Sequence, residues 1–239
     1  MKKLFTLLAL TISFSMNAQL TAVTENGNTG QRLSTSNASN HGDIGFNAVD
    51  LSYSSSSSST RGATGSNAVA MGFSTTASGD YSTAMGGGTT ASGNESTAMG
   101  GGTTASGWYS TAMGASTNAN GNYSTAMGEG ASASGTYSTA MGYNTTASAE
   151  ASTAMGYSTT ASTQSSTAMG AGTTASGYAS TAMGRLTTAS DYASTVIGQY
   201  NSSGSSATSA GSFSTSAPAF VIGNGTASNA KSDAFKVMF

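Results

Sequence analysis

His41 is the residue best suited to acid–base chemistry, and it is the only histidine in the chain. A general base needs partners that hold it against its substrate. Its neighbours Asn40, Gly42 and Asp43 are instead typical of a turn. Serine is so frequent here that no single serine indicates a nucleophile. We therefore predict no catalytic residue and no enzyme activity.

Glycine and aspartate do not form a recognised ligand motif either. Gly86, Gly87 and Gly88 resemble a phosphate loop only in glycine content, because neither a lysine nor a helix start follows them. Calcium-binding β-roll repeats need an aspartate in every unit, and none recurs in that way. The sequence predicts no cofactor and no metal ion.

Aromatic residues recur at fixed positions of the repeat, which favours stacking between rings of the same chain. Four share one position of a 14-residue repeat, and three occupy the position just before it: Tyr81, Tyr109, Tyr123 and Tyr137, then Trp108, Tyr178 and Tyr192. On stacked coils these rings would form ladders that contact glycans or protein ligands. Stacking of the rings on one another, at about 0.5 to 1.5 kcal/mol per pair, is the simpler explanation, and the two roles are compatible. Glu95 interrupts the first ladder.

The repeat that positions these residues is the strongest signal in the chain. Ser82-Thr83-Ala84-Met85-Gly86 returns unchanged at 96, 110, 124, 138, 152, 166 and 180. Ten units run from Ser66 to Ser205, and degenerate copies flank them at 47–52 and 221–223. A fixed period with atypical end units predicts a solenoid.

Strand alternation explains the repeat better than a helix does. Fourteen residues equal two heptads, but each interior glycine costs a helix about 1 kcal/mol and no leucine seam compensates. Two short strands per coil would instead place only small residues inside a narrow coil. In one unit the predicted inward residues are Thr89, Ala91, Gly93, Ser96, Ala98 and Gly100. The predicted fold class is all-β, a β-solenoid of 14-residue coils.

An apolar column is predicted on the outer face of the second strand. Its members are Val69, Met71, Met85, Met99, Met113, Met127, Met141, Met155, Met169, Met183 and Ile197. Ten coils about 4.8 Å apart make a rod about 48 Å long. Burying nine methionines and one isoleucine at about 2 kcal/mol each gives about 20 kcal/mol gross, against an association cost of about 4 to 15 kcal/mol. We predict that copies of the chain meet along this column. The alternative is that methionine fills the coil interior.

A polar face is predicted on the first strand. Thr90 and Ser92 have counterparts in most coils, so Thr-x-Ser pairs repeat as rows of hydroxyl groups. Such rows resemble the ice-binding faces of β-solenoid antifreeze proteins. Asn118 with Asn120, and Ser132 with Ser134, interrupt the threonine column.

The N-terminus has the features of a secretory signal. Lys2 and Lys3 precede an apolar run that ends near Ala18, where we place the cleavage site. Removing the two lysines changes the formal net charge from −2 to −4, so nothing attracts nucleic acid or anionic lipid. With 0 Cys, disulfides cannot stabilise the fold.

The repeats resemble the YadA-like head repeats of trimeric autotransporter adhesins, in which Ser-x-Ala-x-Gly and Ala-x-Gly return every 14 residues. The resemblance implies a left-handed parallel β-roll, a homotrimer around one axis, and exposure on a cell surface (outer-membrane associated) or outside the cell. It also implies adhesion to host or environmental surfaces, with glycans or extracellular matrix proteins as ligands. In that family Val and Ile usually flank the inner alanine, where this chain has Thr97 and Met99.

The expected organisation is a signal peptide at 1–18, a lead-in with a degenerate coil and a Ser-rich loop at 19–65, ten head repeats at 66–205, and a cap or connector at 206–239. No stalk heptads or barrel strands follow Ser205, so the sequence predicts no membrane anchor of its own. The predicted function is an adhesin head. An ice-binding protein and a spacer without ligand are the alternatives.

Overall fold

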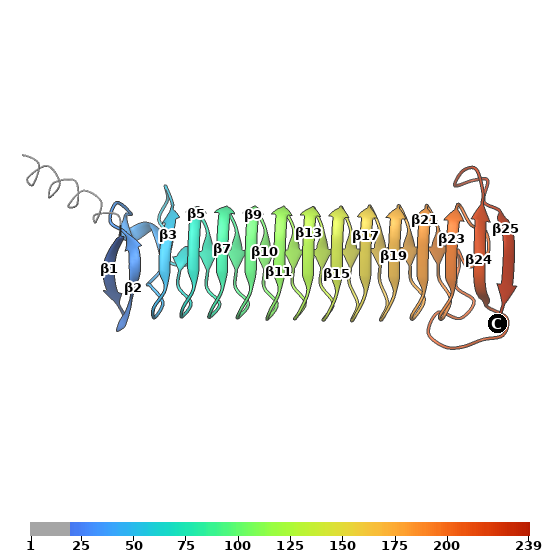
Figure 1. Cartoon of the computed structure of the whole chain (residues 1–239), viewed down its shortest axis with the longest axis horizontal. Helices are drawn as coiled ribbons and strands as arrows, with labels where there is room; N and C mark the ends of the chain where they lie inside the picture. The colour runs from blue at the N-terminus through green and yellow to red at the C-terminus, as the bar shows by residue number, and fades with distance from the viewer. Residues whose placement is uncertain (1–19) are drawn as a thin grey trace, which may run out of the picture.

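The computed structural model describes residues 20–239, and the predicted signal peptide at 1–18 lies outside them. The described chain forms an elongated rod in which consecutive coils follow one another in sequence order (Figure 1). Strands of successive coils pair in parallel and in register, as in Met99 with Met113 and Met113 with Met127. The predicted all-β solenoid of 14-residue coils is therefore confirmed.

Each regular coil contains one long and one short strand. The long strands have five residues each: β3 (Val49–Tyr53), β5 (Val69–Phe73), β7 (Thr83–Gly87), β9 (Thr97–Gly101), β11 (Thr111–Ala115), β13 (Thr125–Glu129), β15 (Thr139–Tyr143), β17 (Thr153–Tyr157), β19 (Thr167–Ala171), β21 (Thr181–Arg185) and β23 (Thr195–Gln199). The short strands have two: β4 (Gly62–Ala63), β6 (Thr76–Ala77), β8 (Thr90–Ala91), β10 (Thr104–Ala105), β12 (Asn118–Ala119), β14 (Ser132–Ala133), β16 (Thr146–Ala147), β18 (Thr160–Ala161), β20 (Thr174–Ala175) and β22 (Thr188–Ala189).

Antiparallel hairpins close both ends of the rod. β1 (Leu20–Glu25) pairs with β2 (Asn28–Leu33), and β24 (Pro218–Asn224) pairs with β25 (Asp233–Met238). A short 3-10 helix, η1 (Ala38–Asn40), follows β2. These strands extend the long-strand sheet to 15 strands, while the short-strand sheet has 10. The degenerate copies are part of the same sheet, because Leu51 pairs with Met71 and Ile222 pairs with Ile197.

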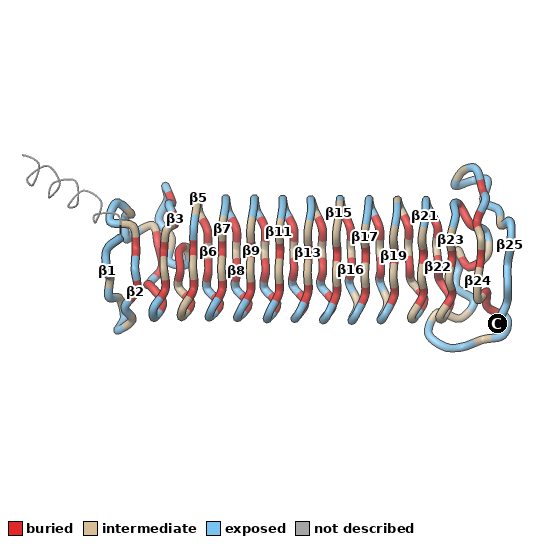
Figure 2. The backbone as a smooth tube through the Cα atoms, in the orientation of Figure 1, coloured by how far each residue is buried: buried red, intermediate tan, exposed pale blue. Residues whose placement is uncertain are grey.

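The interior of the coils in the middle of the rod holds only small side chains. Figure 2 shows that buried segments recur in every coil along the rod. Thr89, Ala91, Ser96 and Ala98 are all 0% exposed, as are most of their counterparts in the other coils. In some coils the buried serine also closes a turn: Ser110 Oγ donates to the carbonyl oxygen of Gly107 at 2.7 Å, whereas Ser96 Oγ has no hydrogen-bond partner among the described residues. Such a thin core leaves no space for a larger residue in the middle of the rod.

Gly100 departs from the prediction that it points inward, because it is exposed. The chain bends here with φ of +118°, a backbone conformation that side-chain-bearing residues rarely adopt. A Cβ at this position would lie 2.0 Å from the carbonyl oxygen of Gly114 in the next coil. Glycine in the repeated Ser-Thr-Ala-Met-Gly motif is therefore required by the bend and by the close approach of the next coil.

Larger residues enter the core only at the two ends. Val196 replaces the inner alanine of β23, and Val221 follows it in β24. Asn201 lies beside β22, the last strand of the short-strand sheet, in the place of a further short strand. Its side-chain oxygen accepts a hydrogen bond from the Thr188 amide at 2.8 Å, and its side-chain nitrogen donates to the Thr188 carbonyl oxygen at 2.9 Å. The side-chain amide thus satisfies backbone groups that no further coil pairs with.

Candidate functional site

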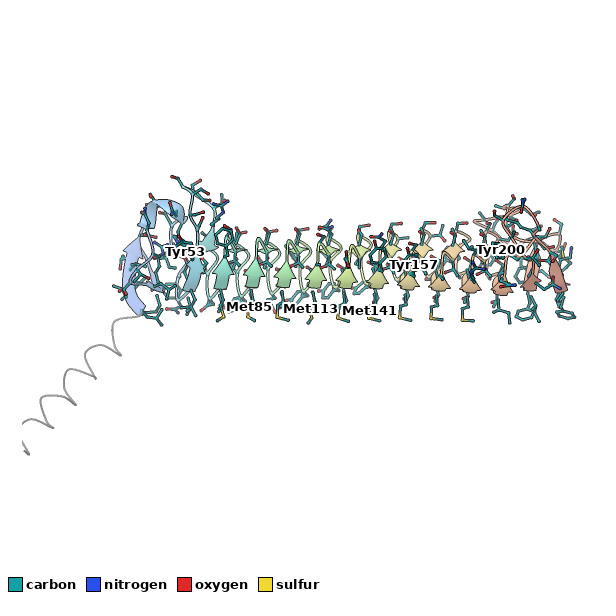
Figure 3. The ribbon with its side chains drawn as sticks, turned by 90° about the horizontal axis from the view of Figure 1, so that it is seen from above. Tyr53, Met85, Met113, Met141, Tyr157 and Tyr200 are labelled. Carbon is teal, nitrogen blue, oxygen red and sulfur yellow. The ribbon has the colours of Figure 1, made fainter. Side chains whose placement is uncertain are left out.

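The methionine column lies on the outer face of the long strands, as Figure 3 shows for Met85, Met113 and Met141. The side chains are half-buried by their neighbours, and Met71 at the N-terminal end reaches 41% exposure. The interior positions beside them are occupied by alanines such as Ala84 and Ala112, both 0% exposed. The alternative in which methionine fills the coil is therefore wrong.

The methionine face becomes more apolar toward both ends of the rod. In the middle coils threonine flanks each methionine, as Thr97 flanks Met99. At the N-terminal end Val49 and Val69 occupy the threonine column. At the C-terminal end Phe220 pairs with Thr195 and with Val237, and Ile222 pairs with Ile197 and with Phe235. We use the name methionine face for this outer surface of β3 to β25.

The hydroxyl face lies on the short strands, where Thr-Ala pairs follow one another in register. Thr90 is half-buried and Ser92 is exposed. Asn118 and Ser132 occupy the threonine column of β12 and β14, as the sequence indicates. Ser106 Oγ donates to Asn120 Oδ1 at 2.8 Å, so some groups of this face bond to each other along the rod.

The first aromatic ladder forms where the sequence places it. Tyr109, Tyr123 and Tyr137 stack with ring centroids 5.0 Å apart, at interplanar angles of 5° and 15°. Tyr178 and Tyr192 form a second stack at 5.3 Å. Tyr81 and Trp108 are exposed and belong to neither of these stacks. Stacking between rings of one chain is thus observed, and ligand contact by the same rings stays a prediction.

Glu95 does more than interrupt the first ladder. Its carboxylate accepts a hydrogen bond from the Tyr109 hydroxyl, and this bond together with the negative charge raises the pKa of Tyr109. Tyr109 is the first ring of this ladder along the chain, one coil after Glu95. A carboxylate at position 95 therefore ends the ladder and interacts with its first ring.

A third aromatic stack was not predicted. Tyr143 and Tyr157, at the ends of β15 and β17, lie with ring centroids 5.1 Å apart and an interplanar angle of 9°. Both follow a Met-Gly pair and are 14 residues apart, so the repeat spacing could have predicted that their rings stack. In Figure 3 Tyr157 lies over the ribbon, away from the side on which the labelled methionines project.

A buried polar cluster at the N-terminal end was also missed. Asp50 occupies the inward column, opposite Ala70, and is 0% exposed. Its carboxylate contacts Arg32 Nε at 3.3 Å and His41 Nδ1 at 3.0 Å, and accepts from Ser52 Oγ at 2.6 Å. A charged residue at an inward position needs buried partners, so the degenerate motif at 47–52 could have indicated this cluster.

This cluster lacks the geometry of a catalytic triad. His41 lies at the end of the 3-10 turn η1, as predicted for a turn residue, and it is only 6% exposed. Ser52 Oγ and the Asp50 carboxylate both approach the same ring nitrogen, Nδ1. A triad needs its base between nucleophile and acid, on opposite nitrogens. The cluster instead closes the end of the core.

Glu25 completes the closure from β1. Burial opposes its ionisation and so raises the pKa, but the hydrogen bonds from Arg32 and from the Ile44 amide, with the Arg32 charge, outweigh burial and leave the pKa below its usual value. Arg32 Nη1 lies 2.8 Å from Glu25 Oε1. The charged pair thus ties the terminal hairpin to the first coil.

Two structural features are absent from residues 20–239. Within this range no three His, Cys, Asp or Glu side chains lie together in a way that could hold a metal ion. Over the same part of the chain, no helix is long and apolar enough to span a membrane.

The geometry defines a repeat protein: a narrow parallel β-solenoid whose coils share one small-residue core and present two different outer faces. The family model described as the YadA head domain repeat (2 copies) matches residues 63–89, 91–117, 106–131, 119–145, 147–173 and 175–201. The chain therefore belongs to the YadA head repeat family, as the sequence resemblance predicted. This family is structural rather than enzymatic. No curated protein matches the chain.

Proposed function

We propose that this chain is the head of an exported adhesin, and that three copies assemble in parallel with their methionine faces around a common axis. The observation that carries the proposal is the unbroken apolar column on the outer face of β3 to β25. A soluble protein rarely leaves so long an apolar stripe uncovered. Membership of the YadA head repeat family supports three as the number of copies.

The ends of the methionine face contribute most to this proposed interface. Because the central methionines are already half-buried within one chain, assembly removes less of their surface from water than full burial would. Phe235 and Val237 are 52% and 42% exposed and offer larger gains. We therefore place the strongest contacts at the C-terminal hairpin and, at the N-terminal end, at Met71, which is 41% exposed.

Adhesion follows from the family and from the outer surface. The rod carries few charges and many hydroxyl groups, with exposed aromatic rings on its edges. Flat rings beside hydroxyl groups suit glycans or extracellular matrix proteins. We propose Tyr81, Trp108, Tyr109, Tyr123, Tyr137, Tyr178 and Tyr192 as the ligand contacts.

The proposed location is the cell surface, in association with the outer membrane, or the extracellular space. It rests on the signal-like N-terminus and on the family. If the chain is exported as proposed, N-terminal sequencing of the secreted or surface form reads from Gln19. A first residue of Met1 would contradict export through this signal.

Ice binding is the second candidate, supported by the in-register threonine column of the short strands. A thermal hysteresis assay separates the two functions. An adhesin gives no gap between melting and freezing points, and binds at least one component in an array of glycans and matrix proteins. A clear thermal hysteresis gap would overturn the adhesin assignment. If the chain binds no component of the array and shows no hysteresis, the result would favour a structural spacer without a ligand.

A further inference from the structure

The stack of Tyr143 and Tyr157 ends at a notch one coil high. In the next coil the same position is Ala171, and in the coil after that it is Arg185. The neighbouring corner position is Gly172 in the notch coil. These residues line a cavity of about 290 Å³, whose full lining is Tyr157, Ser158, Ala171, Gly172, Arg185 and Leu186.

The height of the notch matches one flat ring. Two coil spacings separate Tyr157 from Arg185, which is about 9 to 10 Å at about 4.8 Å per coil. The rings of Tyr143 and Tyr157 lie 5.1 Å apart. A ring placed at the level of Ala171 would therefore stack on Tyr157 at about the same distance and meet Arg185 on its other side.

Arg185 is held in place to cover such a ring. Its guanidinium carbon lies 5.2 Å from the centroid of the Tyr200 ring, in a cation–π contact. Within residues 20–239 Arg185 forms no salt bridge, and it is exposed. The guanidinium group thus lies over Tyr200, and Arg185 is also one of the residues that line the notch.

The lining favours an aromatic ring over a sugar. Apart from the Arg185 guanidinium, the Ser158 and Tyr157 hydroxyls are the polar side-chain groups around the notch, and Ala171 and Leu186 are apolar. A sugar ring carries hydroxyl groups on most of its edge and needs several convergent polar partners. An aromatic side chain needs only the two stacking surfaces.

We propose that this notch binds an aromatic side chain of a partner protein, inserted between Tyr157 and Arg185 as the missing rung of the stack. The site lies on the edge where the long strands end, while the labelled methionines project to one side (Figure 3). The proposal therefore does not depend on assembly through the methionine face. It goes beyond general adhesion by naming a site and a ligand chemistry.

The test uses N-acetyl-tyrosinamide as the probe and the full chain labelled with ¹⁵N. Titration followed by NMR is expected to shift the amide signals of Ala171 and Gly172, and saturation-transfer difference should report contact with the probe ring. Replacing Ala171 by tyrosine (Ala171→Tyr) fills the notch with the chain's own ring, so the Kd should rise at least tenfold.

Ala115→Tyr is the matched control. Ala115 occupies the same column between Gly101 and Glu129, so the new tyrosine has no ring to stack on and leaves the notch open. This variant should bind the probe as the unmodified chain does. Arg185→Gln keeps the notch but removes the cation, and the Kd should rise about two- to fivefold, as expected for an exposed cation–π contact.

Three results would overturn the proposal. The first is no shift at Ala171 and Gly172 at any probe concentration. The second is equal affinity of Ala171→Tyr and the unmodified chain, which would place the probe elsewhere. The third is binding of methyl β-glucopyranoside at the notch in preference to the aromatic probe. The mass of each sample in solution, measured in parallel, reports on assembly separately.

Discussion

The two halves of each coil are built by the same alternation but differ in how strictly they repeat. The long-strand half keeps Ser-Thr-Ala-Met-Gly unchanged in eight consecutive coils, from Ser82 to Gly184. The short-strand half varies: its outer residue is Thr90, Asn118 or Ser132, and its turn residue is Gly93, Ala149 or Asp191. The difference indicates that the long strand is constrained on its outer face as well as on its inner face, whereas the short strand is constrained mainly on its inner face.

The inward residues and the glycine of the long-strand half each meet a structural demand of the coil. Serine and alanine fill the core, the serine hydroxyl also closes the turn at Ser110, Ser152 and Ser166, and glycine permits the bend against the next coil. Methionine and threonine face outward, where core packing alone would accept many residues, as it does on the short strands. Strict repetition of an outward methionine therefore suggests a partner surface, and the short-strand face carries no such signal.

The largest expected effect comes from placing charge on the methionine face. Met127→Asp with Met141→Asp is expected to convert a trimer into an aggregating or unfolded chain, because each carboxylate would be buried without a partner. Sedimentation velocity measures this. The matched control is Ser134→Asp with Ser148→Asp in the same coils on the exposed hydroxyl face, which should sediment as the unmodified chain.

A glycine pair tests the bend of the long-strand half. Gly86→Ala should lower the free energy of unfolding by about 1 to 3 kcal/mol or more, because φ is +120° and the added Cβ would lie 2.0 Å from the Gly100 carbonyl oxygen. Gly87→Ala is the control, since nothing lies within 4 Å of its added Cβ. Urea denaturation compares the two. Equal midpoints would contradict the bend as the reason for this glycine.

Removal of a ladder ring is expected to have a smaller effect. Tyr123→Ala breaks two stacks, at about 0.5 to 1.5 kcal/mol each, while the backbone tolerates alanine because Ala179 and Ala193 adopt the same left-handed φ at this position. Tyr81→Ala is the control, since no aromatic stack involves Tyr81 among the described residues. In thermal unfolding, Tyr123→Ala should have a lower Tm than Tyr81→Ala. Equal stability with lost ligand binding would assign the ladder to recognition alone.

The smallest effect concerns pH at the N-terminal end. The pKa of Glu25 is lower in the folded chain than in the unfolded chain, so its contribution is complete above the unfolded value of about 4.3. This stability is lost as pH falls through the lower, folded pKa. Glu25→Gln should remove that part of the pH dependence below about pH 4. An unchanged acid-unfolding curve would contradict the role of the pair with Arg32.

The sequence predicted what repeats and missed what occurs once. The solenoid, the small-residue core and the outward methionine column follow from alternation over ten coils, because each position is sampled ten times. The cluster of Arg32, His41 and Asp50 has a single copy, so no period indicated that these residues meet. The notch forms because Ala171 stands where the two preceding coils have tyrosine. Its walls come from residues of three coils, and their three-dimensional arrangement cannot be read from the repeat pattern.

The inward assignment of Gly100 failed for a different reason. Alternation assigns direction by parity, but parity holds only while the backbone stays extended. At φ of +118° the strand bends, and the residue leaves the interior. A pattern of small residues therefore could not separate a glycine that fills a core from one that permits a bend.

The measurement that tests the central claim most directly is the mass of the folded chain in solution, by multi-angle light scattering on the mature form from Gln19. The account predicts a single species of three chains that persists on dilution, since the methionine face must be covered. A stable, folded single chain with its methionine face open to water would contradict it.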